Sequence, residues 1–547
     1  MSNSNKSGCG FLPILGTVIV LIGTGVGAYY YFQGGKPSQD NIALQGAQVV
    51  PESAFASSFI STNNQDWKQL TQYGTPQTQQ AIKNGLEEWE KETFPNTKIT
   101  FDQDIKPWID GLTFALLPGN LSSKKIDQNQ ILLVIGIKDK IKADQFSKKL
   151  EKEPEITFEK RDYKGISIVE TTNSKGDRFI WALVGDQIVL SEKSETVEQA
   201  IDTFKGEPSY AKKPGFKQMV SQRLKLENPL IQVYLPDYSQ MMEQTIKSQG
   251  REIPATTLKQ LKAVESMVMG ISAEKVGLHL QAIAKVKPEQ IVKFPQSVSG
   301  EVLTEFPQNT LAFINGKGIN EGWENLVEQS QQEPELKGFV TQVRQGFKTA
   351  NLEADQDVFG WMDGEFALGI LNLKKGGIAN LGIGAMMVIE TSDRPTAETA
   401  IKKLDQMAKF TPFIKLNQSQ VGAINLTEWT IPQQGTVLSY GWIANQSFML
   451  TSGTSWATVK TEQKNSSLPQ NSKFKDIQNS LPDNNLGYGF LDIEQIIISL
   501  DGLPGTIIDP EAKTILESIE GLGMTVTQPN KSTSQVDVIL SLKSVIK

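Results

Sequence analysis

The sequence repeats itself in one order over nearly its whole length. Residues 50–290 can be laid over residues 305–547 with offsets that stay between about 252 and 260 positions. The most visible match pairs "DQDIKPWIDG" at 102–111 with "DQDVFGWMDG" at 355–364. Small drifts in offset are what loop insertions between equivalent elements produce. The repeat therefore predicts that one fold is present twice.

Each copy contains both helical and strand periodicities. In the first copy, the apolar run at 130–137 predicts a strand and the pattern at 142–153 predicts a helix, and alternating strands follow. We expect an α+β chain: an N-terminal transmembrane helix and then two tandem homologous domains, each a mainly antiparallel sheet with helices packed on one face. The expected segments are a cytoplasmic tail at 1–10, a membrane span at 11–32, a linker at 33–48, and repeats at 49–300 and 301–547.

The segment Phe11–Phe32 has 22 residues and no charge. As a helix it is long enough to cross a hydrocarbon core of roughly 30 Å. The alternative is a cleaved signal peptide with Lys6 as its positive region and Val26-Gly27-Ala28 at the cut. We favour the anchor, because the apolar run exceeds the roughly 7–15 residues of a signal peptide and aromatic residues rather than polar ones flank the possible cut. This segment predicts a single-pass membrane protein.

The flanks of the span bear on orientation and self-association. Lys6 and a very short tail precede it and Lys36 follows it, which favours a cytoplasmic N-terminus and an ectodomain on the other side of the membrane. Gly23 and Gly27 form a GxxxG spacing, which would let two such helices pack closely and associate weakly. Glycine is also common in membrane helices that do not associate.

Composition excludes much familiar chemistry. Cys9 is the only cysteine and His279 the only histidine, so no disulfide framework and no multi-histidine or cysteine metal site can be built. The net charge is -7 without a basic stripe, so we expect no nucleic-acid partner. His279 lies in an alternating strand beside Leu278 and Leu280, and a solvent-facing histidine is the default expectation, with Ile539 as its counterpart in the second copy.

The repeated acidic motif is the obvious candidate for a metal site. An EF-hand would need an oxygen ligand two positions after Asp104, but Lys106 stands there, and Phe359 stands at that place in the second copy. We therefore interpret the motif as structural: Asp102 or Asp104 caps a short helix, Trp108 anchors that helix in the core, and Asp110-Gly111 makes the turn into the strand that follows. The lone SxxK at Ser472–Lys475 is best explained as a chance match to the serine-hydrolase motif, since no KTG partner accompanies it. We predict no catalytic, cofactor-binding or metal-binding residues.

Together, an N-terminal membrane helix, a duplicated α+β ectodomain and the motif D-x-D-[IV]-x-x-W-[IM]-D-G resemble the cyanobacterial proteins grouped as domain of unknown function 3352. The resemblance implies a thylakoid or plasma membrane location with a lumenal or periplasmic ectodomain. It brings no established catalytic residues.

Three functions remain open from sequence. The first is a non-enzymatic ectodomain that binds other membrane or lumenal proteins, as an assembly or maintenance factor for a membrane complex. The second is a carrier or sensor that holds a lipid or pigment. The third is an envelope hydrolase that uses two carboxylates, although no pair stands out. We place the first ahead, because the chain lacks the usual reactive groups.

Overall fold

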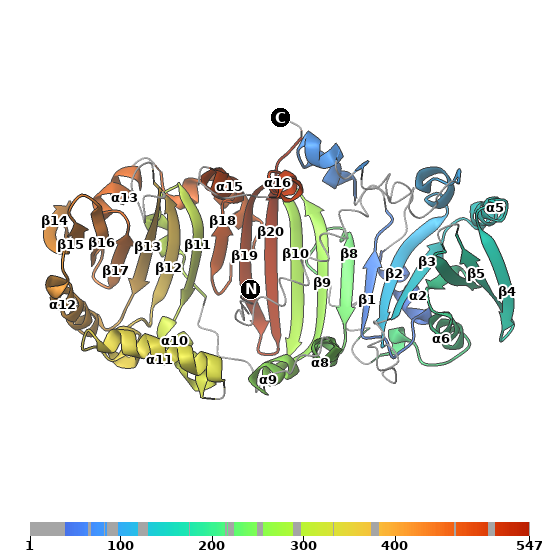
Figure 1. The fold of residues 1–547 in the computed structure, drawn as a ribbon, viewed down its shortest axis with the longest axis horizontal. Helices are drawn as coiled ribbons and strands as arrows, with labels where there is room; N and C mark the ends of the chain where they lie inside the picture. Colours follow the sequence, from blue (N-terminus) through green and yellow to red (C-terminus); the bar gives the residue numbers. More distant parts are fainter. Residues whose placement is uncertain are drawn as a thin grey trace. The chain divides into compact units, whose positions relative to one another are not determined.

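The structure is a computed structural model that describes most of residues 39–545 (Figure 1). The internal segments left undescribed are 64–66, 81–82, 85–96, 119–129, 174–175, 214–215, 217–223, 249–254, 288–296, 332, 374–381, 464–465 and 502–508. The predicted span Phe11–Phe32, with Gly23 and Gly27, lies outside the described residues. Within the described ranges, no helix is both long enough and apolar enough to cross a membrane.

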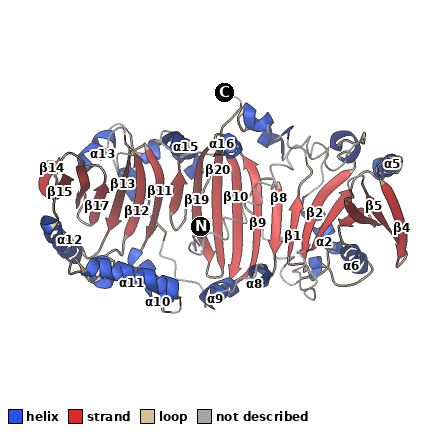
Figure 2. Cartoon of the chain, in the orientation of Figure 1, coloured by secondary structure: helices blue, strands red, loops and turns tan. Residues whose placement is uncertain are grey.

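The chain divides into two compact units, the first mainly residues up to 290 and the second mainly 291–543. Each is a mixture of helices and an antiparallel sheet (Figure 2). In the first unit the strands pair in the order β4-β5-β6-β7-β3-β2-β1-β8-β9-β10. Their bounds are β1 Ala56–Ile60, β2 Ile109–Leu117, β3 Gln130–Ile137, β4 Thr157–Tyr163, β5 Ile166–Thr172, β6 Arg178–Val184, β7 Gln187–Ser191, β8 Ile231–Leu235, β9 Val264–Glu274 and β10 Gly277–Val286.

The second unit pairs its strands in the order β14-β15-β16-β17-β13-β12-β11-β18-β19-β20. Position by position, this is the order of the first unit. The bounds are β11 Thr310–Lys317, β12 Glu365–Asn372, β13 Ile383–Glu390, β14 Lys415–Val421, β15 Ile424–Ile431, β16 Gly435–Trp442, β17 Ser447–Ser452, β18 Tyr488–Leu491, β19 Ile519–Asn530 and β20 Thr533–Leu542. The mainly antiparallel α+β class expected from the sequence is confirmed.

Helices connect the strands in both units. Those of the first unit are α2 Gln39–Val49, α5 Lys140–Leu150, α6 Ser194–Phe204, α8 Tyr238–Ser248 and α9 Ala255–Ala263. Those of the second are α10 Ile319–Ser330, α11 Pro334–Lys348, α12 Arg394–Phe410, α13 Trp456–Gln463, α14 Ser472–Asn479, α15 Ile493–Asp501 and α16 Pro510–Leu516. Short helical turns include η2 Phe101–Ile105, η6 Ala354–Val358 and η8 Leu468–Gln470.

The core of the first unit forms where α2 and α6 lie on the central strands. Val197, Ala200 and Ile201 of α6 are fully buried against Ala182 of β6 and Val189 of β7. These α6 residues fall at helical spacing on one face, which is how an amphipathic helix buries its apolar stripe on a sheet. The first unit therefore builds its core by helix-on-sheet packing.

The second unit buries helices against both faces of its sheet, which corrects the expectation of one covered face. Ala397 of α12 packs with Ile389 and Tyr440. On the opposite face, the backbone N–H of Trp456 in α13 donates to Ser439 Oγ (3.4 Å), and Ser439 is the strand neighbour of Tyr440. Successive strand residues point to opposite faces. β13 buries Val388 and Ile389 on opposite faces and β17 buries Phe448 and Met449 in the same way, so each face of these strands is covered.

Candidate functional site

An apolar face runs across the central strands of the second unit, and α12 covers its β13 end, where Met387 packs against the cluster that contains Ala397. Strand register places two continuous rows of residues on this face, from β13 through β12, β11, β18 and β19 to β20 (Figure 1). One row is Met387, Leu368, Ile314, Gly489, Met524 and Val538, and the other is Ala385, Ile370, Ala312, Leu491, Leu522 and Leu540. None of the twelve positions carries a polar side chain. We call these residues the apolar face.

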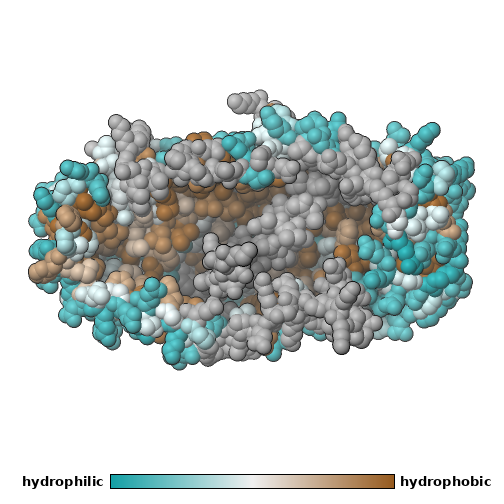
Figure 3. Space-filling model, in the orientation of Figure 1, coloured by the Kyte–Doolittle hydropathy of each residue, from teal (hydrophilic) through white to brown (hydrophobic). Residues whose placement is uncertain are grey.

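Much of the apolar face is open to solvent. Ile314 is 51% exposed, Ile370 40% and Leu491 36%. Figure 3 shows hydrophobic surface gathered over the strands of this unit. On the other side of the same strands, Phe313 and Phe490 are 1% exposed. An exposed patch of this kind marks a lipid, ligand or protein interaction site more often than an accident of folding.

The other side of the final hairpin is polar and buried, the reverse of the usual arrangement. In β20, Gln535, Asp537 and Ser541 lie on the buried face, whereas Val538 and Leu540 lie on the half-exposed face. Gln535 Nε2 donates to Asp537 Oδ2 at 2.7 Å, so these buried polar groups are paired. The hydrophobic effect favours the opposite distribution. Val538 and Leu540 therefore lie on the half-exposed face, where an apolar partner from outside the described helices could cover them.

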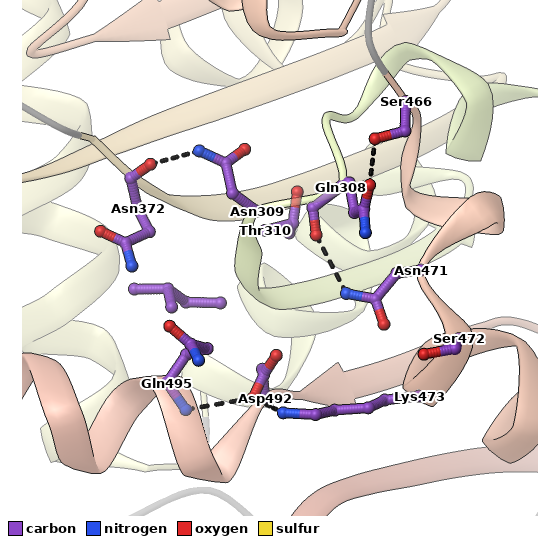
Figure 4. Close-up of a pocket in the computed structure, with 11 residues that line it drawn as sticks. Gln308, Asn309, Thr310, Asn372, Ser466, Asn471, Ser472, Lys473, Asp492 and Gln495 are labelled. Carbon is purple, nitrogen blue, oxygen red and sulfur yellow. Dashed lines mark hydrogen bonds and ion pairs between the residues drawn. The ribbon is translucent and has the colours of Figure 1, made fainter.

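A polar cleft of about 430 Å³ lies at the ends of β11 and β12 (Figure 4). It is lined by Gln308, Asn309, Thr310, Leu311, Asn372, Ser466, Asn471, Ser472, Lys473, Asp492 and Gln495. Its walls are the starts of α14 and α15 and the segment before β11. Five of these side chains are amides, which offer both hydrogen-bond donors and acceptors.

Hydrogen bonds among its own residues hold the cleft in shape. Asn471 Nδ2 donates to the Gln308 carbonyl at 3.0 Å, while Asn471 Oδ1 accepts from the Phe474 N–H at 3.2 Å and caps α14. Asn309 Nδ2 donates to the carbonyl of Asn372. Asp492 Oδ1 accepts from the backbone N–H of Gln495 at 3.1 Å at the start of α15 (Figure 4). The cleft is thus built from helix caps and loop amides.

Lys473 is the one lysine that lines the cleft, and it is held by two carboxylates. Its Nζ lies 3.2 Å from Asp492 Oδ1 and 2.5 Å from Glu494 Oε2. Burial alone would lower the pKa of Lys473, but the hydrogen bond to Glu494 and the charges of both acids raise it above the usual value. The same hydrogen bond and one from Lys543 lower the pKa of Glu494. The ion pairs with Asp492 and Glu494 therefore favour the protonated form of Lys473.

The cleft adjoins the apolar face through β12. Leu368, Ile370 and Asn372 alternate along this strand onto the same side of the sheet, and Asn372 also lines the cleft. Leu491 of the apolar face immediately precedes Asp492 of the cleft. The two features together form an amphipathic surface. Its amides are contributed by separate segments, so no sequence motif predicts it.

The acidic motif has a structural role in both units. In the first, Asp104 Oδ2 accepts from the Thr100 N–H at 2.9 Å and Lys149 binds the same carboxylate at 2.7 Å, while Trp108 Nε1 donates to the Asp104 carbonyl at 2.8 Å. The segment is the π-helical turn η2, which leads into β2. The motif forms a π-helical turn rather than the expected short α-helix. Asp104 lies inside this turn, whose N-cap is Thr100, and Asp110 and Gly111 lie within β2 rather than in a turn before it. Among the described residues, no cluster of potential ligands could hold a metal ion.

The second unit repeats these contacts. Asp357 Oδ2 accepts from the Glu353 N–H at 3.0 Å and binds Lys403 at 3.1 Å, and Trp361 Nε1 donates to the Asp357 carbonyl at 3.1 Å. The hydrogen bond from the Glu353 N–H is the main cause that lowers the pKa of Asp357, and Lys403 adds to it. Phe359 occupies the expected non-ligand position and stacks on Trp323 at a centroid distance of 4.2 Å.

His279 does not face solvent, which corrects the expectation for it. The residue is buried and its Nδ1 lies 2.8 Å from Glu274 Oε1. Counted from the β9–β10 and β19–β20 turns, its counterpart is Gln535 rather than Ile539. His279 lies on β10 of the first unit and Gln535 on β20 of the second, and both are buried; alternation alone could not show which face of these strands is covered.

The SxxK serine lies at the cleft, but its lysine does not line it. Ser472 begins α14 and borders the cleft, whereas Lys475, three residues later, is absent from its walls. Asn471 caps this helix. The pattern is thus a helix start, as the sequence interpretation held.

Comparisons with known proteins identify the family of this chain. No curated protein matches the chain. Crystal forms I and III of TP0453 are similar at 9% identity, with TM-scores of 0.24 and 0.26, over 45% of this chain and 81% and 82% of that one. Residues 14–542 match the family described as "Protein of unknown function (DUF3352)". The chain belongs to that family, DUF3352.

Proposed function

We propose that the chain is a non-enzymatic lipid-binding protein. The apolar face of the second unit accepts acyl chains, and the adjoining cleft accepts the polar end of the same molecule. The observation that carries this proposal is the pair of unbroken apolar rows across six strands, half-exposed where Ile314, Ile370 and Leu491 lie. Lipid-binding sites combine an extensive apolar lining with a few placed polar groups.

The cleft fits an uncharged or zwitterionic head group. Amide and hydroxyl groups of Asn372, Gln495 and Ser472 offer hydrogen bonds. Lys473 is already paired with Asp492 and Glu494, so its charge is balanced within the protein. A strongly anionic head group would have to compete with those carboxylates. Glycolipids and other hydroxyl-rich lipids match this chemistry best.

Photo-crosslinking tests the proposal. The full chain, in mild detergent, is mixed with a diazirine-bearing fatty acid, irradiated, digested and mapped by mass spectrometry. We expect adducts on β11, β12, β18 and β19, reduced several-fold by Ile314→Lys. The matched control is Leu183→Lys in β6, a residue with nearly equal exposure, 52% against 51%. Absence of adducts from those strands, or an equal loss in both variants, would contradict lipid binding there.

The expected role as an interaction or assembly factor is the second candidate. Exposed apolar faces of this kind also dock proteins. The same two variants distinguish protein docking from lipid binding. If a protein docks on this face, mild chemical crosslinking in solubilised membranes should yield a protein adduct with the wild-type chain and with Leu183→Lys, but not with Ile314→Lys. A carboxylate-based hydrolase draws no support from the cleft, because Asp492 is committed to Lys473 and to the α15 cap.

We also infer that the two units are homologous domains that arose by duplication. Three observations support this inference: the identical strand order, the repeated aspartate-lysine-tryptophan contacts around η2 and η6, and the steady sequence offset. A superposition of the units on their strands that failed to align Trp108 with Trp361 would refute it.

The location that we propose is a single-pass anchor at Phe11–Phe32 with the remainder outside the cytoplasm. Cys9 is the only thiol and precedes that segment. A membrane-impermeant maleimide should label it in intact cells only after the inner membrane is permeabilised. Labelling without permeabilisation would reverse the orientation, and a mature chain that lacks Cys9 would favour the cleaved signal peptide.

A further inference from the structure

Two phenylalanines project into solvent where α12 connects to β14. Phe410 is 88% exposed and Phe413 81%, the highest values among the large hydrophobic side chains that the structure describes. Neither ring is therefore packed in the core of the second unit. Burying either ring elsewhere would remove a large apolar area from water.

The turn that carries Phe413 holds it in an unfavourable backbone conformation. The Ile414 N–H donates to the Thr411 carbonyl at 3.3 Å, and Pro412 occupies the second position of this four-residue turn. Phe413, at the third position, has φ +73°. Such a turn normally places glycine or asparagine there, because a side chain strains the positive-φ region. Packing within the chain does not explain the phenylalanine, since its ring is exposed.

The surroundings of the two rings are basic. Lys409 and Lys415 flank them, and the sequence contains no carboxylate from Gln406 to Thr427. The nearest acid before this stretch, Asp405, accepts hydrogen bonds from Trp429 Nε1 at 2.9 Å and Tyr440 Oη at 2.5 Å. The charge of the loop is therefore positive and its tip apolar.

At the equivalent place the first unit has a turn with the same hydrogen bond, but with neither aromatic residues nor a positive φ. Between α5 and β4, the Ile156 N–H donates to the Glu153 carbonyl at 3.2 Å, and Pro154 is followed by the exposed Glu155. Glu155 stands where Phe413 stands in the second unit. The fold therefore does not require phenylalanine at this turn, and the two units differ here in both charge and polarity.

We propose that the loop of residues 409–415 in the second unit inserts into the head-group region of an anionic lipid bilayer. The phenyl rings enter the boundary between head groups and acyl chains, while Lys409 and Lys415 remain at the level of the phosphates. Aromatic rings favour that depth and lysines near an anionic surface add attraction. This loop shares no residue with the cleft or the apolar face, so its insertion does not depend on lipid binding there.

A fluorescent label on the turn tests this proposal. Full-length Cys9→Ser protein with Thr411→Cys carries a nitrobenzoxadiazole group, and the matched control carries it at Glu153→Cys in the first unit. Both are reconstituted in phosphatidylcholine vesicles with and without phosphatidylglycerol, with nitroxide-labelled lipid as quencher. We expect at least twofold quenching and a blue-shifted emission for the Thr411 label in anionic vesicles, and weaker effects in high salt or without phosphatidylglycerol.

The decisive variant is Phe413→Gly, alone and combined with Phe410→Ser, on the Thr411→Cys background. Glycine suits the backbone of this position, so loss of folding cannot account for a lost signal, and the thermal midpoint verifies this. Loss of quenching in the variants supports insertion. The proposal is overturned if the two label sites behave alike, if Phe413→Gly keeps full quenching, or if the blue shift grows with protein concentration and needs no anionic lipid, which would indicate contact between chains. Failure of the fatty-acid crosslinking at Ile314 would leave these outcomes unaffected.

Discussion

Phe313 and Ile314 are neighbours on β11 that face opposite sides of the sheet, and truncating each measures how well each side is covered. Phe313 is 1% exposed and packs edge-on against Phe306 at 4.9 Å and against Phe474 at 6.4 Å. Phe313→Ala should therefore lower the free energy of unfolding of the second unit by about 3–5 kcal/mol, the range for buried phenylalanines.

Ile314→Ala should cost much less. A fully buried isoleucine loses about 2–5 kcal/mol on truncation to alanine, but Ile314 is 51% exposed. Scaling by the covered half gives roughly 1–2.5 kcal/mol, so the two variants should differ by about 2 kcal/mol. Both substitutions lie in one strand, so differences in strand propensity are small.

Hydrogen–deuterium exchange of the β11, β12 and β18 peptides in increasing urea measures the two values locally. It avoids the assumption that a chain with two units unfolds in one step. Equal losses for both variants would show that the apolar face is covered within the protein, and would remove the basis for a ligand there. A small loss for Ile314→Ala that grows after lipid is added would support the proposed site.

Three further outcomes follow from the structure. Burial and the neighbouring Glu365 raise the pKa of Glu390, so the folded state binds more protons than the unfolded state. The free energy of unfolding should therefore fall as the pH rises from the unfolded pKa of this group through its raised folded pKa. Glu390→Gln should make the urea midpoint less dependent on pH across that window. Lys403→Met should raise the pKa of Asp357 in an NMR titration and lower the free energy of unfolding by roughly 0.2–1 kcal/mol. An unchanged pKa would show that the two residues do not form an ion pair in solution. Phe413→Gly should stabilise the second unit by about 1 kcal/mol in thermal melts, because it relieves a positive φ, and a lower midpoint would show that the ring packs.

Local features of the fold were predictable where one residue type had one physical role. In the acid-rich motif, Asp104 and Asp357 accept backbone N–H hydrogen bonds in the turns before β2 and β12, a structural role that depends on residues close in sequence. The antiparallel α+β class followed from alternating patterns joined by short turns. These predictions depend on neighbours in sequence, which a single sequence shows directly.

Features that depend on which face is covered were not predictable. Alternation in β20 separates Val538 and Leu540 from Asp537 and Ser541, yet it does not say which set meets the helices. His279 was misjudged for the same reason, since its strand is buried on both sides near Glu274. The cleft could not be foreseen either, because its amides come together only through tertiary contacts.

The buried pair of Gln535 and Asp537 has a consequence for how the final hairpin finds its alignment. If β20 slid by one residue against β19, every side chain of β20 would change sides, and Gln535 and Asp537, which lie on the same strand, would move together. Asp537 would then lie opposite Met524 or Val526 of β19, whereas in the observed register Asp537 lies opposite Thr525 and Gln535 lies opposite Thr527. Moving a carboxylate among apolar side chains costs free energy. The facing polar residues of the two strands therefore favour one pairing register, and the opposite side of the hairpin can be uniformly apolar.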